Sequence, residues 1–285
     1  MWDILGLQML VLAALVFVPL ERLFSTHAQD LFRPRWTLDL THALVSGLAI
    51  KLGLALILFL IVVSAEALMP AVVGETVSAW PLWVQIPLAL VLSDLGFYWV
   101  HRLFHAVPFL WRFHSVHHSI QELDWLAGSR VHPLDQTLTK GASILPVFAL
   151  GFSETTIVAY GLIYFWQSLL LHSNVNLHLP FLSRIIALPR FHHWHHADHE
   201  ESFDTNFAGQ LAILDWVFGT WYAPADQGLP SQYGTQDPVP SGYLDQLLYP
   251  FGLSRADAPT LRAPEPTPEP DVSTRTESAG TASVP

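Results

Sequence analysis

Two long apolar stretches limit the fold of this 285-residue chain more than any other feature. Residues 43–63 and 82–100 are each long enough, as helices, to cross a hydrocarbon core about 30 Å thick. The composition agrees, because 51% of the residues are hydrophobic and only 13% are charged, against roughly 25% in soluble domains. A helix in lipid satisfies its own backbone hydrogen bonds. We therefore predict an all-α integral membrane protein.

Three further apolar stretches bring the prediction to about four to five membrane-embedded helices. Residues 4–20 have the length of a signal peptide, but they lack a positively charged start and a small-residue cleavage site, so we predict a retained anchor. Residues 142–152 are short for a crossing and are separated from residues 156–171 by a brief polar step. A helical hairpin that enters the membrane and returns fits this pair best.

The arginines predict which side of the membrane each loop faces. The loop at 21–39 carries three arginines, and Arg102 and Arg112 follow the stretch at 82–100, whereas residues 64–83 contain neither lysine nor arginine. Loops rich in lysine and arginine stay cytoplasmic. We therefore predict a multi-pass protein with a cytoplasmic histidine-rich cap and a cytoplasmic C-terminal tail.

The distribution of histidine points to chemistry. Thirteen of the fifteen histidines lie between His101 and His199. They include one H-x-x-x-H pair and two H-x-x-H-H motifs, and these spacings place imidazoles on one side of a helix. One ion takes roughly four to six ligands, so the eight histidines of these motifs predict two metal ions. The eight are His101, His105, His114, His117, His118, His192, His195 and His196.

The other histidines in this region differ in what their positions predict. His172 is the expected ninth ligand, because the hairpin would return it to the side that holds the others. His132 is a candidate tenth ligand, with a structural role as the alternative. His178, His193 and His199 are expected to lie behind the ligands or on the surface.

The type of metal follows from what the sequence lacks. Without cysteine there is no thiolate site, iron–sulfur cluster or disulfide. Imidazole accepts zinc, copper, iron and nickel, but the H-E-x-x-H motif of zinc hydrolases does not occur here. An all-histidine pair of ions at a membrane surface better suits iron that activates dioxygen. Its target would be a C–H bond of a lipid, which is the substrate that such a site can reach.

Over residues 85–223 the sequence resembles the fatty acid hydroxylase superfamily, in its bacterial sterol desaturase-like branch. The resemblance implies an enzyme with two iron ions that hydroxylates or desaturates sterols, sphingolipid acyl chains or ether lipids, with the nine histidines as ligands. Asn176 stands where some fatty acyl hydroxylases have a further histidine, which weakens an assignment to acyl 2-hydroxylation. The matching motifs are D-x-x-x-Y-W-x-H-R-x-x-H from Asp94, W-x-x-H-x-x-H-H-S from Trp111, R-x-H-P from Arg130, H-S-N-V from His172, P-R-F-H-x-x-H-H from Pro189, D-x-N-F from Asp204 and D-W-x-F-G-T from Asp215.

Four polar residues are expected beside the ligands. Asp94 and Tyr98 lie on the helical side of His101, and a carboxylate within a span needs a partner, either a ligand imidazole or an arginine. A hydrogen bond in helix packing is the alternative role. Asp204 and Asn206 are expected to orient the last histidine group, or to cap turns and helices.

These observations divide the chain into four predicted parts. Anchor helices occupy residues 1–84, and a fatty acid hydroxylase/sterol desaturase-type catalytic domain occupies residues 85–223. An amphipathic extension follows at 224–254. The tail at 255–285 is rich in proline, threonine, serine and glutamate and cannot bury a core, so we expect it to be disordered.

The predicted function is that of a membrane-bound, iron-dependent oxygenase that hydroxylates or desaturates a sterol-like, acyl or ether lipid. Dioxygen is the predicted co-substrate. Electrons must come from an external ferredoxin- or cytochrome-type donor with its reductase, because the sequence has no Gly-rich dinucleotide motif and no haem domain. The net charge of −11 and the lack of a basic patch disfavour a nucleic-acid partner.

Two alternatives stay open at this point. The first is a carotenoid hydroxylase or ketolase, since these enzymes also use histidine clusters on helices. The second is a metal transporter or another metal-binding membrane protein without enzymatic activity. A transporter would place its ligands along the spans near the midplane, whereas the histidines here are expected at helix ends.

Overall fold

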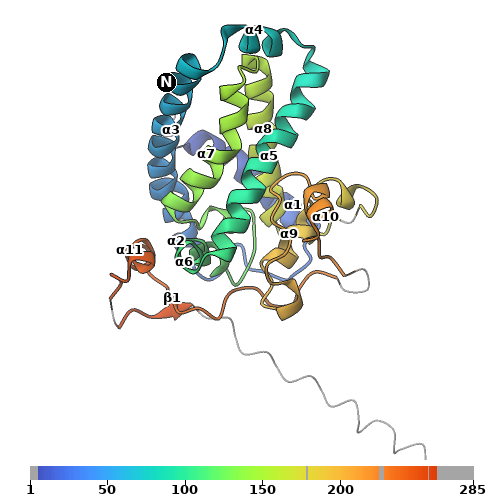
Figure 1. Ribbon diagram of the computed structural model, residues 1–285. Coiled ribbons are helices and arrows are strands. Elements are labelled where there is room, and N and C mark those ends of the chain that lie inside the picture. The colour runs from blue at the N-terminus through green and yellow to red at the C-terminus, as the bar shows by residue number, and fades with distance from the viewer. Residues whose placement is uncertain (1–5, 178, 225–227, 256, 262–285) are drawn as a thin grey trace, which may run out of the picture.

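The structure is a computed structural model that describes residues 6–177, 179–224, 228–255 and 257–261. These residues are mostly helical, with one short antiparallel pair of strands, β1 (Val239–Pro240) and β2 (Thr260–Leu261). Figure 1 shows a bundle of long helices at one end and a cap of short helices and loops at the other. Of the predicted tail at 255–285, the structure describes residues 255 and 257–261, and it places Thr260–Leu261 in β2 rather than in disorder. Disorder of the remaining tail residues, which lie outside the described residues, stays a prediction.

Two helical runs among the described residues are long and apolar enough to cross a membrane. The first, Trp36–Leu68, joins α2 (Trp36–Thr41), a π-helical turn (His42–Ser46) and α3 (Gly47–Leu68) without a break. The second is α5 (Leu82–Ala106). The two stretches predicted from the sequence fall within these runs.

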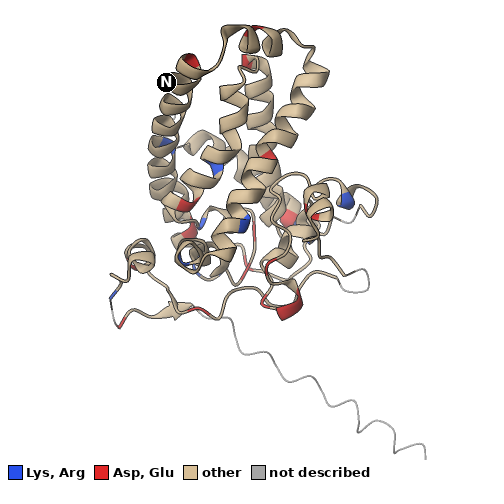
Figure 2. Ribbon diagram, in the orientation of Figure 1, with Lys and Arg blue, Asp and Glu red and all other residues tan. Residues whose placement is uncertain are grey.

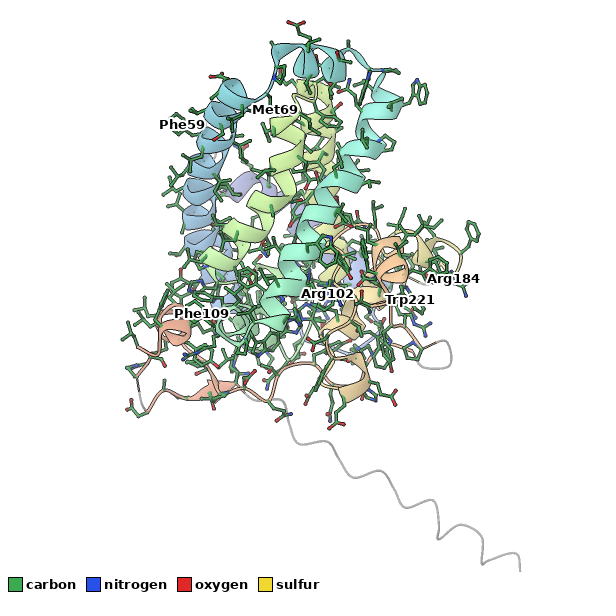
Figure 3. All side chains as sticks on the ribbon, viewed as in Figure 1. Phe59, Met69, Arg102, Phe109, Arg184 and Trp221 are labelled. Carbon is green, nitrogen blue, oxygen red and sulfur yellow. The ribbon has the colours of Figure 1, made fainter. Side chains whose placement is uncertain are left out.

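The side chains of α3 face outward along most of its length. Leu56 is 60% exposed and Phe59 is 63% exposed, and Figure 3 shows Phe59 pointing away from the bundle. Each exposed Å² of such apolar surface costs about 25 cal/mol in water and nothing comparable in lipid. The outer face of α3 is therefore suited to a hydrocarbon environment.

The predicted hairpin is formed by α7 (Pro133–Ala149) and α8 (Glu154–His172). The turn uses Gly151 with φ 72°, and Ser153 caps α8 by accepting a hydrogen bond from the backbone N–H of Thr156. Helix α7 begins earlier than its apolar stretch suggested. Its first turns bury the polar side chains of Asp135 and Thr139 inside the protein, which hid the helix from a reading of hydropathy.

The bundle is held together by α5 and α7, each of which also contacts a further helix: α7 packs on α3, and α5 packs on α8. Gly96 of α5 allows the closest approach, because a Cβ there would overlap the carbonyl oxygen of Ala142. Helix α1 (Leu7–Leu23) packs its buried Ala13 and Phe17 towards Trp166 of α8. Neither α1, α7 nor α8 meets the length and hydropathy criterion that the two candidate spans meet.

The cap contains the remaining helices and most of the charge. Figure 2 marks few charged residues along the bundle, acidic ones near α4 (Ala71–Ala79) and a mixture of both signs in the cap. The cap helices are α6 (Pro108–His118), α9 (Pro189–His195), α10 (Ile213–Phe218) and α11 (Tyr243–Leu248), with single 3₁₀ turns at Ala127–Ser129, Leu182–Arg184, Glu200–Ser202 and Tyr249–Phe251. The end of α5 and the end of α8 both reach this cap.

Candidate metal centre

Four helix ends bring the nine predicted ligand histidines together. His101 and His105 lie on the last two turns of α5. Pro108 stops that helix, because the residue before a proline avoids the helical region, and Val107 accordingly has φ −102° and ψ 114°. The chain turns there, so that α6 packs on α5 and its last five residues supply His114, His117 and His118. The other four are His172 at the end of α8, His192 and His195 on α9, and His196 directly after it.

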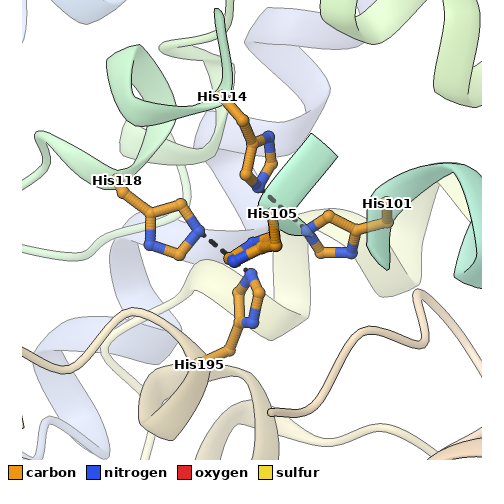
Figure 4. Close-up of side chains that lie close together, drawn as sticks. All are labelled: His101, His105, His114, His118 and His195. Atoms are coloured by element: carbon orange, nitrogen blue, oxygen red, sulfur yellow. Dashed lines mark hydrogen bonds between the residues drawn. The ribbon is translucent and has the colours of Figure 1, made fainter. Parts of the chain in front are cut away.

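The nine histidines form two compact groups. The five-histidine group contains His101, His105, His114, His118 and His195 (Figure 4). The four-histidine group contains His117, His172, His192 and His196. Within each group one ring nitrogen per residue lies within 4.8 Å of all the others. The structure therefore brings together all nine histidines nominated from the sequence, and it places His132 in neither group.

For five of the nine histidines, a hydrogen bond at Nδ1 fixes which ring nitrogen faces the centre of the group. In the five-histidine group, Nδ1 of His101 donates to the carbonyl of Phe207 (2.7 Å), and Nδ1 of His195 donates to the carbonyl of Thr205 (2.8 Å). A carbonyl oxygen only accepts, so Nδ1 carries the hydrogen and Nε2 keeps a lone pair. The same holds for His114, whose Nδ1 is 2.8 Å from the carboxylate of Asp135. The lone pairs of these rings therefore point inward.

The four-histidine group is built in the same way. Nδ1 of His117 donates to the carbonyl of Arg130 (3.0 Å), and Nδ1 of His172 donates to the carbonyl of Ser168 (2.8 Å). The two Nε2 atoms then face each other at 3.2 Å, each with a lone pair. The Nε2 atoms of His101 and His114 do the same at 2.9 Å. Lone pairs at these distances repel, and a cation between them removes the repulsion, so the donor set of each group fits one metal ion.

Burial keeps these rings neutral and therefore able to bind a cation. Outside the spans, burial and the neighbouring histidines lower the pKa of His117, His118, His192 and His196 well below 6.5. Burial likewise lowers the pKa of His195 to about 3. Three ring nitrogens are buried without a hydrogen-bond partner within the described residues: Nε2 of His105 and Nδ1 of His192 and His196. The unpaired Nε2 of His105 agrees with metal binding, whereas the Nδ1 atoms of His192 and His196 lie on the far side of rings whose Nε2 atoms face the group.

Asp135 is a site residue that the sequence reasoning missed. Its side chain is 0% exposed and reaches His114 from the first turns of α7. A carboxylate behind a ligand histidine fixes the ring and makes it a better donor to a cation. An aspartate three residues after a histidine and two after a helix-starting proline was the available signal. It was passed over because the apolar stretch used to locate this helix begins only at residue 142.

Asp94 has a different role from the one predicted. Within the described residues, its carboxylate accepts backbone N–H hydrogen bonds from Gly209 (2.8 Å), Gln210 (3.1 Å) and Leu211 (2.6 Å). The expected partner, an imidazole or an arginine, does not occur at these oxygens. The carboxylate instead fastens the loop after residue 206 to α5. This loop matters for the site because the carbonyl of Phe207 holds His101.

The other three predicted polar residues lie around the same loop. The Tyr98 hydroxyl is 2.9 Å from Oγ1 of Thr220 and accepts from Nη1 of Arg102 (3.2 Å), and its hydrogen-bond partners among the described residues include no histidine of the two groups. Asp204 and Asn206 both have positive φ, at 54° and 59°. Asp204 lies 3.3 Å from Nδ1 of His105, as expected of an orienting residue, although it is 72% exposed.

Asn206 ties the loop to α9 rather than to an imidazole. Its amide donates to the carbonyl of Phe191 (2.7 Å), and its oxygen accepts from the backbone N–H of Tyr222 (2.7 Å). Asp215 completes the loop by accepting from the backbone N–H groups of Phe207 (2.7 Å) and Ala208 (2.8 Å). Both residues act on the histidines through the backbone that they hold.

The other histidines that the structure describes lie outside the two groups. His132 caps α7, because its Nδ1 accepts from the backbone N–H of Leu134 and its Nε2 donates to the carbonyl of Leu247 (3.2 Å). Both ring nitrogens are therefore in use, and the structural alternative holds for this residue. His193 is buried behind the ligands, between Tyr233 (2.8 Å) and the carbonyl of Ser173 (3.1 Å). His199 is exposed, and His178 lies outside the described residues.

Comparison with known families agrees with this centre. Residues 86–220 match the fatty acid hydroxylase family, and this segment contains all nine histidines of the two groups together with Asp135. This segment, a little under half of the chain, is similar to that family. The resemblance seen in the sequence motifs is thereby confirmed. No solved structure shows a significant match to the chain.

Several proteins similar to this chain are lipid enzymes by name. Ornithine lipid hydroxylase OlsE of Rhizobium tropici is 33% identical over 60% of this chain and 52% of its own length. Alkylglycerol monooxygenase of Danio rerio is 30% identical over 61% of this chain and 38% of its own. Delta(7)-sterol-C5(6)-desaturase of Nicotiana tabacum is 25% identical over 48% and 49%. The match thus spans about half the length of these relatives or less.

Proposed function

We propose that this protein is a membrane-bound diiron oxygenase that hydroxylates a C–H bond of a lipid. One observation carries the proposal: nine buried imidazoles, five of them held from behind at Nδ1 by a carbonyl or carboxylate, converge on two points through Nε2. The named relatives, which are lipid hydroxylases, monooxygenases and desaturases, support the reaction type. Nine neutral ligands without a thiolate also suit iron that changes oxidation state.

The ions would supply dioxygen activation, and the chain would orient the ligand rings and exclude water from the centre. Hydroxylation consumes one dioxygen, two electrons and two protons, and it yields the alcohol and one water. Residues behind the ligands hold each ring in one orientation, which keeps both groups assembled through the reaction. Aromatic rings exclude water at the five-histidine group, where Trp111 and Phe207 lie 5.0 and 5.1 Å from the ring of His105, measured between centroids.

Desaturation is the near alternative at the same centre. It consumes the same dioxygen, electrons and protons but removes two hydrogens from neighbouring carbons and yields two waters. A sterol desaturase stands among the relatives, and so do hydroxylases. We propose hydroxylation because an ornithine lipid hydroxylase and two alkylglycerol monooxygenases reach 30% identity or more, whereas the sterol desaturase named above is 25% identical.

The proposal includes an orientation in the membrane. The cap and both histidine groups would face the cytoplasm, because arginines lie in the cap while the α4 end carries Glu66, Glu75 and Glu154 and no lysine or arginine between residues 64 and 83. A ferredoxin- or cytochrome-type donor would then reach the cap from the cytoplasm while the lipid enters from the bilayer. The hairpin of α7 and α8 and helix α1 would be embedded with the two candidate spans, giving four to five embedded helices.

The decisive experiment combines metal analysis with isotope labelling. Protein purified after iron-replete expression should contain close to two iron ions per chain. Supplied with a reducing donor, membrane lipids and heavy dioxygen, it should place one heavy oxygen atom in a lipid product. A lipid that loses two hydrogens and gains no oxygen would replace hydroxylation by desaturation. Iron-loaded, reducible protein that changes no lipid or carotenoid would refute the oxygenase and favour the metal-transport alternative.

A further inference from the structure

A cavity of about 600 Å³ lies beside α1, apart from the two histidine groups. Its walls come from α1, the segment at 25–32, the start of the Trp36–Leu68 run and residues 124–126. The volume falls within the roughly 300–1,000 Å³ that small-molecule sites occupy. The residues named so far for the metal centre do not line it, so the cavity needs its own explanation.

The cavity is apolar along α1 and polar where α1 ends. Val11, Ala14 and Val18 line the apolar part, with Trp125 from the opposite wall. A shallow, open and mostly apolar groove adjoins the cavity at Val11, and its lining residues are Leu7, Gln8, Val11, Leu12 and Leu15 of the same helix. From Leu7 to Glu21 the helix rises about 21 Å, more than the roughly 15 Å of one leaflet of the hydrocarbon core. Cavity and groove together therefore match an extended hydrocarbon chain with a polar end.

The polar end carries both signs of charge. Asp124 is already paired, because its two oxygens accept from Nε and Nη2 of Arg33 at 2.7 Å each. The other charged lining residues are Glu21, Arg22 and Asp30, of which Arg22 and Asp30 are exposed at the mouth. A head group with one positive and one negative charge complements this pair, whereas a purely anionic head would meet the carboxylates. Charge complementarity therefore selects a zwitterionic head.

The segment at 25–32 that lines the cavity is hydrogen-bonded to the residues that follow His172, a member of the four-histidine group. Asn174, two residues after His172, accepts from the backbone N–H groups of Thr26 (3.2 Å) and His27 (2.9 Å) and donates to the carbonyl of His27 (2.7 Å). The backbone N–H of Asn176 donates to the carbonyl of Phe24 (2.8 Å). Any occupant of the cavity therefore contacts the loop that these bonds attach to the end of α8.

We propose that the cavity and its groove bind one membrane lipid with a zwitterionic head group. The head lies between Arg22 and Asp30, and one hydrocarbon chain runs along α1 past Val11. The lipid belongs to the leaflet that faces the cap, since the polar end of the cavity lies at the cap end of α1. Binding at this site requires neither iron nor turnover, so an inactive oxygenase has no bearing on it.

The test measures lipid binding by native mass spectrometry of the full-length protein in detergent. The probes are lysophosphatidylethanolamine, lysophosphatidylglycerol and monoacylglycerol with the same chain, which carry zwitterionic, anionic and uncharged heads. The zwitterionic lipid should bind about threefold more tightly than the other two, because Arg22 and Asp30 are exposed and water screens the charge pairs that they form with the head. Equal binding of all three would overturn the proposed head-group recognition.

Two space-filling variants locate the binding site. Val11→Trp fills the groove and Ala28→Trp fills the mouth from an exposed loop, so each should weaken lysophosphatidylethanolamine binding by about tenfold, as if about two methylene groups lost their contacts. Leu56→Trp on the outward face of α3 is the matched control and should bind as the unaltered protein does. Melting temperature and metal content verify that each variant is folded. Unchanged binding in folded Ala28→Trp, or an equal loss in Leu56→Trp, would refute the site.

Two charge variants address the head group directly. Asp30→Asn and Arg22→Gln should each reduce the preference for the zwitterionic over the uncharged lipid. A preference that survives in both variants would show that these two residues do not recognise the head, and would overturn this part of the assignment.

Discussion

Replacement of Asp135 by asparagine isolates the contribution of a residue that touches no metal. Asp135 is 0% exposed and lies 2.8 Å from Nδ1 of His114. Asparagine keeps the shape and an accepting oxygen but removes the charge. A hydrogen bond to a charged group contributes about 1.5–3 kcal/mol and a neutral one about 0.5–1.5, so the loss is roughly 1–1.5 kcal/mol. This corresponds to about tenfold in metal affinity, at the lower end of the 10- to 100-fold that such residues show.

The chain offers a matched control for this change. Asp204 also contacts Nδ1 of a group histidine, His105, but at 3.3 Å and with 72% of its side chain exposed. Water screens that contact, so Asp204→Asn should lower metal affinity by less than about threefold. Apoprotein would be titrated anaerobically with ferrous iron against a competing chelator, and retained metal would be counted by elemental analysis. Equal losses in the two variants, or full affinity in Asp135→Asn, would refute the reasoning.

Three further predictions test the site, the loop behind it and the topology. His117→Ala and His195→Ala should each abolish activity and lower metal content, whereas His132→Asn should do neither, because asparagine also caps a helix; product assays and elemental analysis decide. Asp94→Ala should lower the melting temperature and destabilise the fold by about 3 kcal/mol or more, since three backbone N–H groups lose their acceptor; an unchanged melting temperature would contradict this. A single cysteine at position 75 should react with impermeant reagents only from outside the cell, and labelling from the cytoplasmic side would reverse the proposed orientation.

Much of the centre could be predicted because ligand spacing is a local property. The i,i+4 pairs His101–His105, His114–His118 and His192–His196 each stay within one group. Residues four apart on a helix differ by about 40° in direction, whereas residues three apart differ by about 60° in the opposite sense. His117 and His195, each three residues after the first histidine of its motif, accordingly belong to the group that does not contain that histidine.

What could not be predicted depends on residues distant in sequence. Asp94 was expected to pair with a histidine or an arginine, but the loop at 209–211 presents three backbone N–H groups to it from 115 to 117 positions away. Asp135 and the carbonyl of Arg130 reach their histidines only after α6 and α7 have packed, and the carbonyl of Phe207 reaches His101 only after its loop has packed on α5. Backbone groups carry no sequence signature, so no motif could have revealed them.

The sequence by itself determined a helical membrane protein with nine clustered histidines, because hydropathy and helical spacing are both readable within a few turns. Only the tertiary structure decided how the nine divide into five and four. That division depends on α5 and α6 meeting at the break before Pro108, and on α9 lying against α8. The tertiary structure also decided that at least five of the rings turn Nε2 towards the centre of their histidine group. The carbonyls and the carboxylate that bind Nδ1 of these rings come from loops and from α7 and α8.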